Sequence, residues 1–129
     1  MSNPGPLVLD SSALLTYMYG ERGWERVEPV FQGAQMSSVN YAEVLSKVAE
    51  RGGDPQETDG EFGPQLLIVP FSAAHALAAA RLRPLTKHLG LSLGDRACLA
   101  LGLERGANVL TADKAWAGLD ISYRVEVLR

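Results

Sequence analysis

This sequence has almost no cysteine, no long apolar run and no excess of positive charge, and each absence excludes a class of protein. Cys98 is the only cysteine, so no disulfide can form within the chain and cysteine-rich zinc sites are excluded. No apolar run approaches the roughly 20 residues that a transmembrane helix needs. The net charge of −3 and the pI near 5.3 argue against a protein that binds nucleic acid by charge alone.

The start of the chain also lacks the pattern of a targeting segment. Residues 1–6 carry neither a basic lead nor a long apolar core, so we expect no signal peptide and a cytoplasmic location. Hydrophobic residues make up 47% of the 129 positions, enough to bury a core. We therefore expect one folded domain over residues 1–129.

Short apolar runs alternate with segments of helical periodicity. The sequence predicts strands, the third of them clearly buried, at 7–9, 35–38, 66–71, 107–111 and 123–128. It predicts helices at 12–19, 21–31, 39–51, 72–83 and from 93 or 94 to 104. Pro84 ends or interrupts the fourth helix, and the polar, glycine-rich residues 52–63 predict an exposed loop with room for a frayed helical turn. This order implies a mostly parallel sheet between two layers of helices, a three-layer α/β/α domain.

Four acidic residues stand where such a fold would gather them: Asp10, Glu43, Asp95 and Asp113. Asp10 ends the first predicted strand and Asp113 closely follows the fourth, while the other two lie near helix starts. Ligands of parallel sheets bind beyond the carboxyl ends of the strands. Gathered carboxylates repel one another unless a cation offsets their charge. The set therefore predicts a site for a hard divalent metal such as Mg²⁺ and metal-assisted phosphoryl chemistry.

The first two of these acidic residues also have ordinary structural roles. Asp10 is a candidate helix N-cap, although Ser11 or Ser12 could cap in its place and leave it free to face the crevice. Glu43 follows Asn40 by three residues, the spacing of a capping box. Spacing alone leaves that role and a position at the strand ends equally open for Glu43.

The other two acidic residues have structural alternatives as well. Asp95 would stabilise the dipole of a first helical turn, with Ser92 as the expected cap. Asp113 would form a turn or a cap after its strand, and Thr111 could orient it or ligate a metal-bound water. Four such coincidences in one small α/β domain favour an acidic site.

Four sequence blocks carry a resemblance to a known family: 8–14 (VLDSSAL), 38–44 (SVNYAEV), 91–100 (LSLGDRACLA) and 110–113 (LTAD). In order and spacing they resemble PIN-domain ribonucleases, specifically VapC-type toxins of type II toxin–antitoxin pairs, over nearly the whole chain. The third block is the most specific, and the fourth acidic position is the one that varies most in such families. The resemblance implies that Mg²⁺ or Mn²⁺ is held by Asp10, Glu43, Asp95 and Asp113, with Ser11 and Thr111 in support.

The resemblance also implies a function and partners. It implies metal-dependent cleavage of RNA by one or two ions, inhibition by a cognate antitoxin, and a homodimer. A second hypothesis is a PIN-fold interaction module that binds antitoxin or RNA without cleaving, although the intact acidic set argues against it. A phosphoryl-accepting receiver domain is a third, disfavoured because such domains place adjacent acidic residues after the first strand.

The densest basic stretch offers a surface for RNA. Its members Arg81, Arg83, Lys87 and Arg96 predict either a phosphate-binding rim beside the acidic site or a solvated helix face. Neither histidine has the neighbours of a nucleophilic triad. We expect His75 to be structural and Cys98 to lie in the core.

Overall fold

The computed structural model describes residues 6–119 and 125–128 of the chain. In this part of the chain the strands are β1 (Leu7–Leu9), β2 (Gln35–Ser37), β3 (Leu67–Val69), β4 (Asn108–Thr111) and β5 (Val125–Val127). They form one sheet in the order β3-β2-β1-β4-β5, and every neighbouring pair is parallel. The carboxyl ends of β1, β2 and β4 therefore meet at the same edge.

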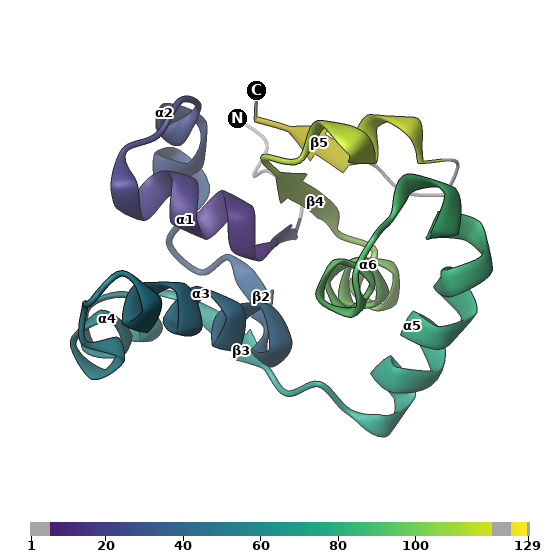
Figure 1. Ribbon diagram of the computed structural model, residues 1–129, viewed down its shortest axis with the longest axis horizontal. Coiled ribbons are helices and arrows are strands. Elements are labelled where there is room, and N and C mark those ends of the chain that lie inside the picture. The colour runs from purple at the N-terminus through teal and green to yellow at the C-terminus, as the bar shows by residue number, and fades with distance from the viewer. Residues whose placement is uncertain (1–5, 120–124, 129) are drawn as a thin grey trace.

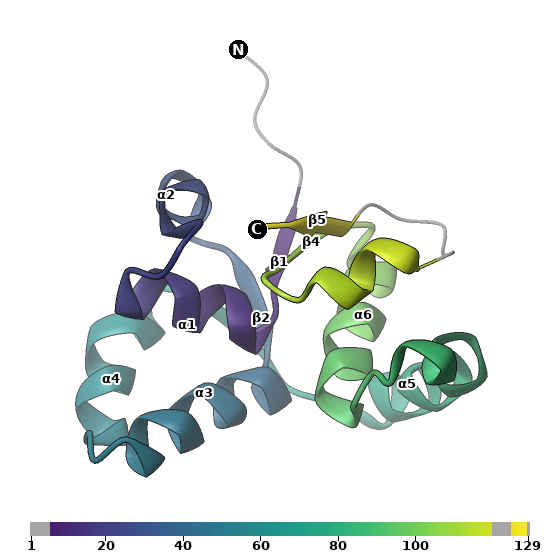
Figure 2. The same cartoon turned by 45° about the horizontal axis from the view of Figure 1, so that its top comes forward.

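Helices cover both faces of this sheet (Figures 1 and 2). The helices are α1 (Ser11–Tyr19), α2 (Trp24–Val27), α3 (Ser38–Glu50), α4 (Pro55–Phe62), α5 (Ala73–Thr86) and α6 (Leu93–Arg105). Short 3-10 turns are η1 (Glu28–Val30), η2 (Gly63–Gln65), η3 (Lys87–Leu89) and η4 (Lys114–Gly118). The predicted three-layer α/β/α architecture with a parallel central sheet is confirmed. No helix in the described residues is long and apolar enough to cross a membrane.

Alternating side chains of the central strands build two separate cores. Val8 and Val109 point to one face, where they pack in a buried cluster with residues of α5 and α6. Leu9 and Leu110 point to the other face and pack with residues of α1, α2 and α3. All four are at most 1% exposed. The two-residue period of a strand thus explains why an almost wholly apolar run forms the middle of the sheet.

The expected loop at 52–63 is wrong, because most of it is helix α4. Asp54 caps this helix by accepting a hydrogen bond from Gln56 N at 2.9 Å, and Pro55 occupies the first turn, where no backbone donor is needed. The Tyr41 hydroxyl donates to Asp59 Oδ1 at 2.6 Å and holds α4 against α3. A cap, an N-terminal proline and this tertiary bond together overcome the low helix propensity of a glycine-containing segment.

Two further expectations need correction. The helix predicted at 21–31 is broken into α2 and η1, since Pro29 lacks the backbone donor that a continuous helix needs. The strand predicted as clearly buried is the edge strand β3, and Leu67 in it is 50% exposed. Helix α5 continues past Pro84 to Thr86. The first two residues of the predicted strand 123–128 lie outside the described residues.

Candidate acidic active site

Asp10 lies buried at the carboxyl end of β1. It is 2% exposed, and its Oδ1 accepts hydrogen bonds from Ser12 Oγ at 2.7 Å and from Ala13 N at 2.8 Å. The bond from Ala13 makes Asp10 the N-cap of α1. Of the alternatives that the sequence left open, Asp10 itself is the cap and not Ser11 or Ser12. The same carboxylate caps α1 and lies at the strand ends.

Thr111, at the end of the neighbouring strand β4, holds the second oxygen of Asp10. Its hydroxyl donates to Asp10 Oδ2 at 2.5 Å, and its Oγ1 accepts from Asp113 N at 3.0 Å. Ser12 accepts from Ala112 N at 2.9 Å while donating to Asp10. Three of the roughly four acceptor positions of the Asp10 carboxylate are thus used, which leaves one free. Ser12 makes these contacts, whereas the sequence had assigned the supporting role to Ser11.

Burial raises the pKa of Asp10 from 3.8 to about 6. The two hydroxyls and the Ala13 N–H lower this pKa, and the nearby charge of Asp95 raises it, but loss of water is the largest influence. Ionising the Asp10 carboxyl group in the metal-free protein therefore costs free energy. A nearby cation would lower that cost.

Asp95 lies in the first turn of α6. Ser92 caps this helix as expected, since its Oγ accepts from Asp95 N at 3.1 Å. Asp95 completes a capping box, because its Oδ2 accepts from Ser92 N at 2.9 Å. Asp95 therefore has a structural role of its own and also places its negative charge close enough to affect Asp10.

Glu43 lies against the same turn of α6, although it comes from α3. The cap of α3 is Ser37, whose Oγ accepts from Val39 N at 3.3 Å, so of the two roles left open for Glu43 the capping box with Asn40 does not form. Asn40 is instead fully buried, and its Nδ2 donates to Glu43 Oε1 at 3.1 Å and to Gly94 O at 2.9 Å. The bond to Gly94 O ties α3 to α6, and the bond to Glu43 holds its carboxylate beside it.

The thiol of Cys98 shows that three of the acidic side chains share one neighbourhood. Cys98 is fully buried in the core, as expected, and burial raises its pKa. The negative charges of Asp10, Asp95 and Glu43 raise it further. Carboxylates from β1, α3 and α6 thus act on the same buried atom.

Asp113 is the outlier among the four. It is exposed and caps η4 by accepting from Ala115 N at 3.0 Å, the turn-forming role that its sequence context allowed. Its backbone N–H reaches the site through Thr111. In the described residues its carboxylate has no hydrogen bond to the other acidic side chains.

The donor set fits a hard divalent cation in its chemistry, since all its members are carboxylate, hydroxyl or amide oxygens. One acceptor position of buried Asp10 is free, and Asn40 Oδ1 is buried without a hydrogen-bond partner in the described structure. Over residues 6–119 and 125–128, however, no three His, Cys, Asp or Glu side chains converge as a ready metal cluster. Asp95 and Glu43 are held by their own local bonds.

The four basic residues differ in their exposure to solvent and in their hydrogen bonds to the rest of the protein. Arg81, Arg83 and Lys87 are exposed on α5 and η3, and Arg83 reaches Leu91 O at 3.5 Å. Arg96 donates to Ala79 O at 3.0 Å and so joins α6 to α5. Their role toward RNA stays a prediction.

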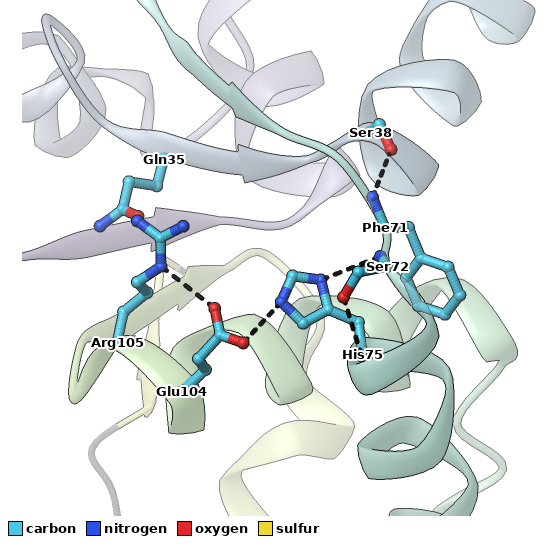
Figure 3. A network of polar contacts seen from close by, with 7 residues as sticks. All are labelled: Gln35, Ser38, Phe71, Ser72, His75, Glu104 and Arg105. Carbon is cyan, nitrogen blue, oxygen red and sulfur yellow. Dashed lines mark hydrogen bonds and ion pairs between the residues drawn. The ribbon is translucent and has the colours of Figure 1, made fainter.

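A second polar network surrounds His75 and includes none of the four acidic residues above (Figure 3). His75 is 4% exposed, and its Nδ1 accepts from Ser72 N at 3.4 Å. Its Nε2 therefore carries the proton and faces Glu104 Oε2 at 2.9 Å. Arg105, beside Glu104, reaches Gln35 Oε1 at 2.9 Å. The expected structural role of His75 is confirmed, because this network joins α5, α6 and β2.

Sequence reasoning named Ser12 and Asn40 as candidate caps and missed Gly94. Ser12 stood beside Ser11, and only the phase of α1 decides which hydroxyl meets Asp10. Asn40 was taken for a cap, since Asn is common at that position. Gly94 could have been found, because glycine is unfavourable inside a helix and this one directly precedes Asp95. Such a glycine indicates that another group lies close to the helix there.

Comparison with known proteins places this geometry in a family. A family model described as PIN domain matches residues 7–121. No curated protein matches the chain. A toxin–antitoxin complex from Klebsiella pneumoniae is similar with a TM-score of 0.76 and 19% identity, covering 95% of this chain and 98% of that one.

Two other solved structures share the fold. VapBC2 from Rickettsia felis, bound to a promoter DNA fragment, has a TM-score of 0.74 and 16% identity, covering 93% of this chain and 96% of that one. VapC20 from Mycobacterium tuberculosis, a sarcin–ricin loop cleaving toxin, has a TM-score of 0.70 and 14% identity, covering 91% and 98%. With the family model matching most of its length, this chain belongs to the PIN domain family.

Proposed function

We propose that this protein is a metal-dependent endoribonuclease of the VapC type, the toxin of a toxin–antitoxin pair in the cytoplasm. The observation that carries the proposal is the buried carboxylate of Asp10, which shares its neighbourhood with Asp95 and Glu43 at the carboxyl edge of a parallel sheet. Membership of the PIN family supports it, as does a fold shared with a toxin that cleaves the sarcin–ricin loop.

Asp10, Glu43 and Asp95 would hold Mg²⁺ or Mn²⁺, with Asp113 completing the outer part of the site. A bound divalent cation would supply Lewis acidity and a water of lowered pKa. Thr111 and Ser12 fix the orientation of Asp10, because each donates a hydrogen bond to a different oxygen of its carboxylate. The Asp95 carboxylate, held by the Ser92 N–H, stays at the start of α6.

The test is cleavage of RNA by the purified protein with Mg²⁺ or Mn²⁺, with EDTA, and with Ca²⁺. We expect cleavage with the first two ions only. Asp10→Asn and Asp95→Asn remove a negative charge at nearly constant shape, so we expect each variant to fold and to lose at least about 100-fold in rate. A folded variant that cleaves at the wild-type rate would refute the assignment.

A second candidate function is a PIN-fold module that binds without cleaving. It is favoured by one observation: in the described residues no three His, Cys, Asp or Glu side chains form a group that could hold a metal ion as they stand. The same assay separates the two, since this module would bind RNA or antitoxin and show no metal-dependent product at any protein concentration.

We also propose an antitoxin and a second copy of this chain as partners. Solved relatives are toxin–antitoxin complexes, which supports the first. The outer side of α5 carries Leu77, 53% exposed, and Leu85, 57% exposed, which supports the second. Co-expression with the product of the adjacent gene should suppress toxicity and give a stable complex. Light scattering of the protein alone should give the mass of a dimer.

A further inference from the structure

We propose that Asn40 and Gly94 position Glu43 in the site: Asn40 holds its carboxylate, and Gly94 leaves the space that the carboxylate occupies. This inference rests on the proposed metal-dependent cleavage and names two positioning residues for it. Neither residue is one of the carboxylates proposed to hold the metal, and in this proposal each acts through Glu43.

The orientation of the Asn40 amide follows from its neighbours. Gly94 O, 2.9 Å from Nδ2, can only accept a hydrogen bond, and Glu43 Oε1 accepts from the same nitrogen at 3.1 Å. The nitrogen must therefore face both, and both its hydrogens are used. Asn40 is fully buried, and its Oδ1 has no partner in the described structure. Burying an amide oxygen without a hydrogen-bond partner costs free energy. We infer that Asn40 stands here for the two hydrogen bonds that its Nδ2 donates.

Gly94 is required for space and not for backbone conformation. Its φ is outside the left-handed region, so the backbone there accepts any residue. A Cβ at this position would lie 2.6 Å from Glu43 Oε1 and 2.7 Å from Glu43 Cδ. The side chain of Glu43 thus fills the volume that a larger residue would take. A glycine inside a helix is otherwise unfavourable relative to alanine.

Together these contacts fix Glu43 at the first turn of α6. The carboxylate is carried by α3 and rests on the backbone beside Asp95, so two helices set its place relative to the other acidic residues. Orienting partners of this kind change metal affinity or activity by about 10- to 100-fold in metal sites. If Glu43 were instead held back from the metal by Asn40, releasing it would strengthen metal binding.

The first experiment is Gly94→Ala, with Gly60→Ala as the matched control. Both glycines lie inside helices, but a Cβ at Gly60 meets nothing within 4 Å. The readout is Mn²⁺ affinity of the metal-free protein by calorimetry, beside the melting temperature. We expect Gly94→Ala to weaken Mn²⁺ binding about tenfold or more, without a lower melting temperature, and Gly60→Ala to leave affinity unchanged. Unchanged or tighter binding in Gly94→Ala overturns the proposal.

The second experiment is a double-mutant cycle of Asn40→Leu and Glu43→Ala. Leucine keeps the volume of Asn40 and removes both donors. We expect Asn40→Leu to weaken Mn²⁺ binding and lower kcat in the wild-type background and to add nothing once Glu43 is gone. An equal loss in both backgrounds would mean that Asn40 acts through packing, and the proposal would fail.

Failure of the proposed function would be seen separately. It fails if the wild-type protein neither takes up Mn²⁺ nor cleaves RNA. The positioning is then judged in the metal-free protein by the ¹³C shift of the Glu43 carboxyl group. We expect that shift to change in Gly94→Ala and not in Gly60→Ala, and an unchanged shift refutes it.

Discussion

The hydroxyl of Thr111 lies 2.5 Å from Asp10 Oδ2 and donates a hydrogen bond to it across 101 positions of sequence. The bond is possible because β1 and β4 are parallel neighbours in register, with Leu9 opposite Leu110. One residue further along each strand, a carboxylate and a hydroxyl meet. This bond holds the half of the Asp10 carboxylate that the α1 cap does not use.

Thr111→Val removes this hydroxyl at nearly constant volume. We expect the pKa of Asp10 to rise above about 6, because one of the bonds that lower it is lost while its burial remains. We also expect the free energy of unfolding to fall by about 1–3 kcal/mol and cleavage to slow. Denaturant unfolding and the pH profile of cleavage measure the two effects. Thr111→Ser keeps the hydroxyl and is the control. If Ser and Val variants behave alike, the hydroxyl has no role.

The raised pKa of Asp10 predicts a pH-dependent stability. Its folded-state pKa of about 6 lies above the ordinary 3.8, so its stabilising contribution is fully present below pH 3.8 and is lost as the pH rises through about 6. The loss is on the order of 3 kcal/mol. In EDTA, Asp10→Asn should therefore be more stable than the wild type at pH 7 and similar to it at pH 4.

Metal should remove this difference. Saturating Mg²⁺ at pH 7 should raise the melting temperature of the wild type more than that of Asp10→Asn, since the variant lacks one of the three carboxylates proposed to hold the ion. Thermal unfolding at pH 4 and 7, with EDTA or Mg²⁺, measures all four states. A wild-type stability that is flat across this range in EDTA contradicts the burial argument.

Replacing Arg81, Arg83 and Lys87 by Ala should weaken RNA binding across sequences. Each lost phosphate contact should reduce the slope of log affinity against log salt by about 0.7, or roughly 2 for all three. Arg96 is left in place because its bond to Ala79 O joins two helices. Affinity is measured against salt, with Ca²⁺ to slow cleavage.

A matched control removes three cations from the other face of the sheet. Arg22 follows α1, Lys47 lies on α3, and Arg51 directly follows α3. Replacing these three by Ala gives the same change in net charge. If both triple variants show the same affinity and slope, net charge alone governs binding and α5 is only a solvated face.

The pair of His75 and Glu104 predicts a separate dependence on acid. The hydrogen bond from His75, aided by Arg105, lowers the pKa of Glu104 below 4.5. Its stabilising contribution is therefore present above pH 4.5 and is lost as the pH falls through the lowered value. Glu104→Gln should flatten the decline in stability below pH 4.5. Glu57→Gln, on an exposed position of α4, is the control and should leave the decline unchanged.

The parallel α/β order followed from the sequence because apolar runs and helical spacing alternate clearly. The helix at 55–62 was not predicted, because α4 is stabilised by the cap from Asp54 and by the tertiary hydrogen bond between Tyr41 and Asp59. The exposure of β3 could not be predicted from composition, because an edge strand and a central strand can be equally apolar. Only the strand order distinguishes them.

Within the site, sequence reasoning found the acidic residues better than their supports. Asp10 stands out because it directly follows an apolar strand, and Asp95 because it lies in the first turn of a largely apolar helix. Asn40 and Gly94 do not, since their role depends on how α3 meets α6, and no local pattern encodes that contact. The caps show the same limit: Asp10 and Asp95 carry structural and site roles together, and spacing cannot separate two roles of one carboxylate.

The pairing of β1 with β4 also sets when the site comes into being. During synthesis Thr111 is added 101 residues after its partner Asp10. At about 5–20 residues per second, the interval lasts on the order of several seconds. For that time a nascent chain carries Asp10 without its hydroxyl support, and a fragment that stops before β4 never acquires it. Synthesis of β4 is thus the step that allows the support of Asp10 to form.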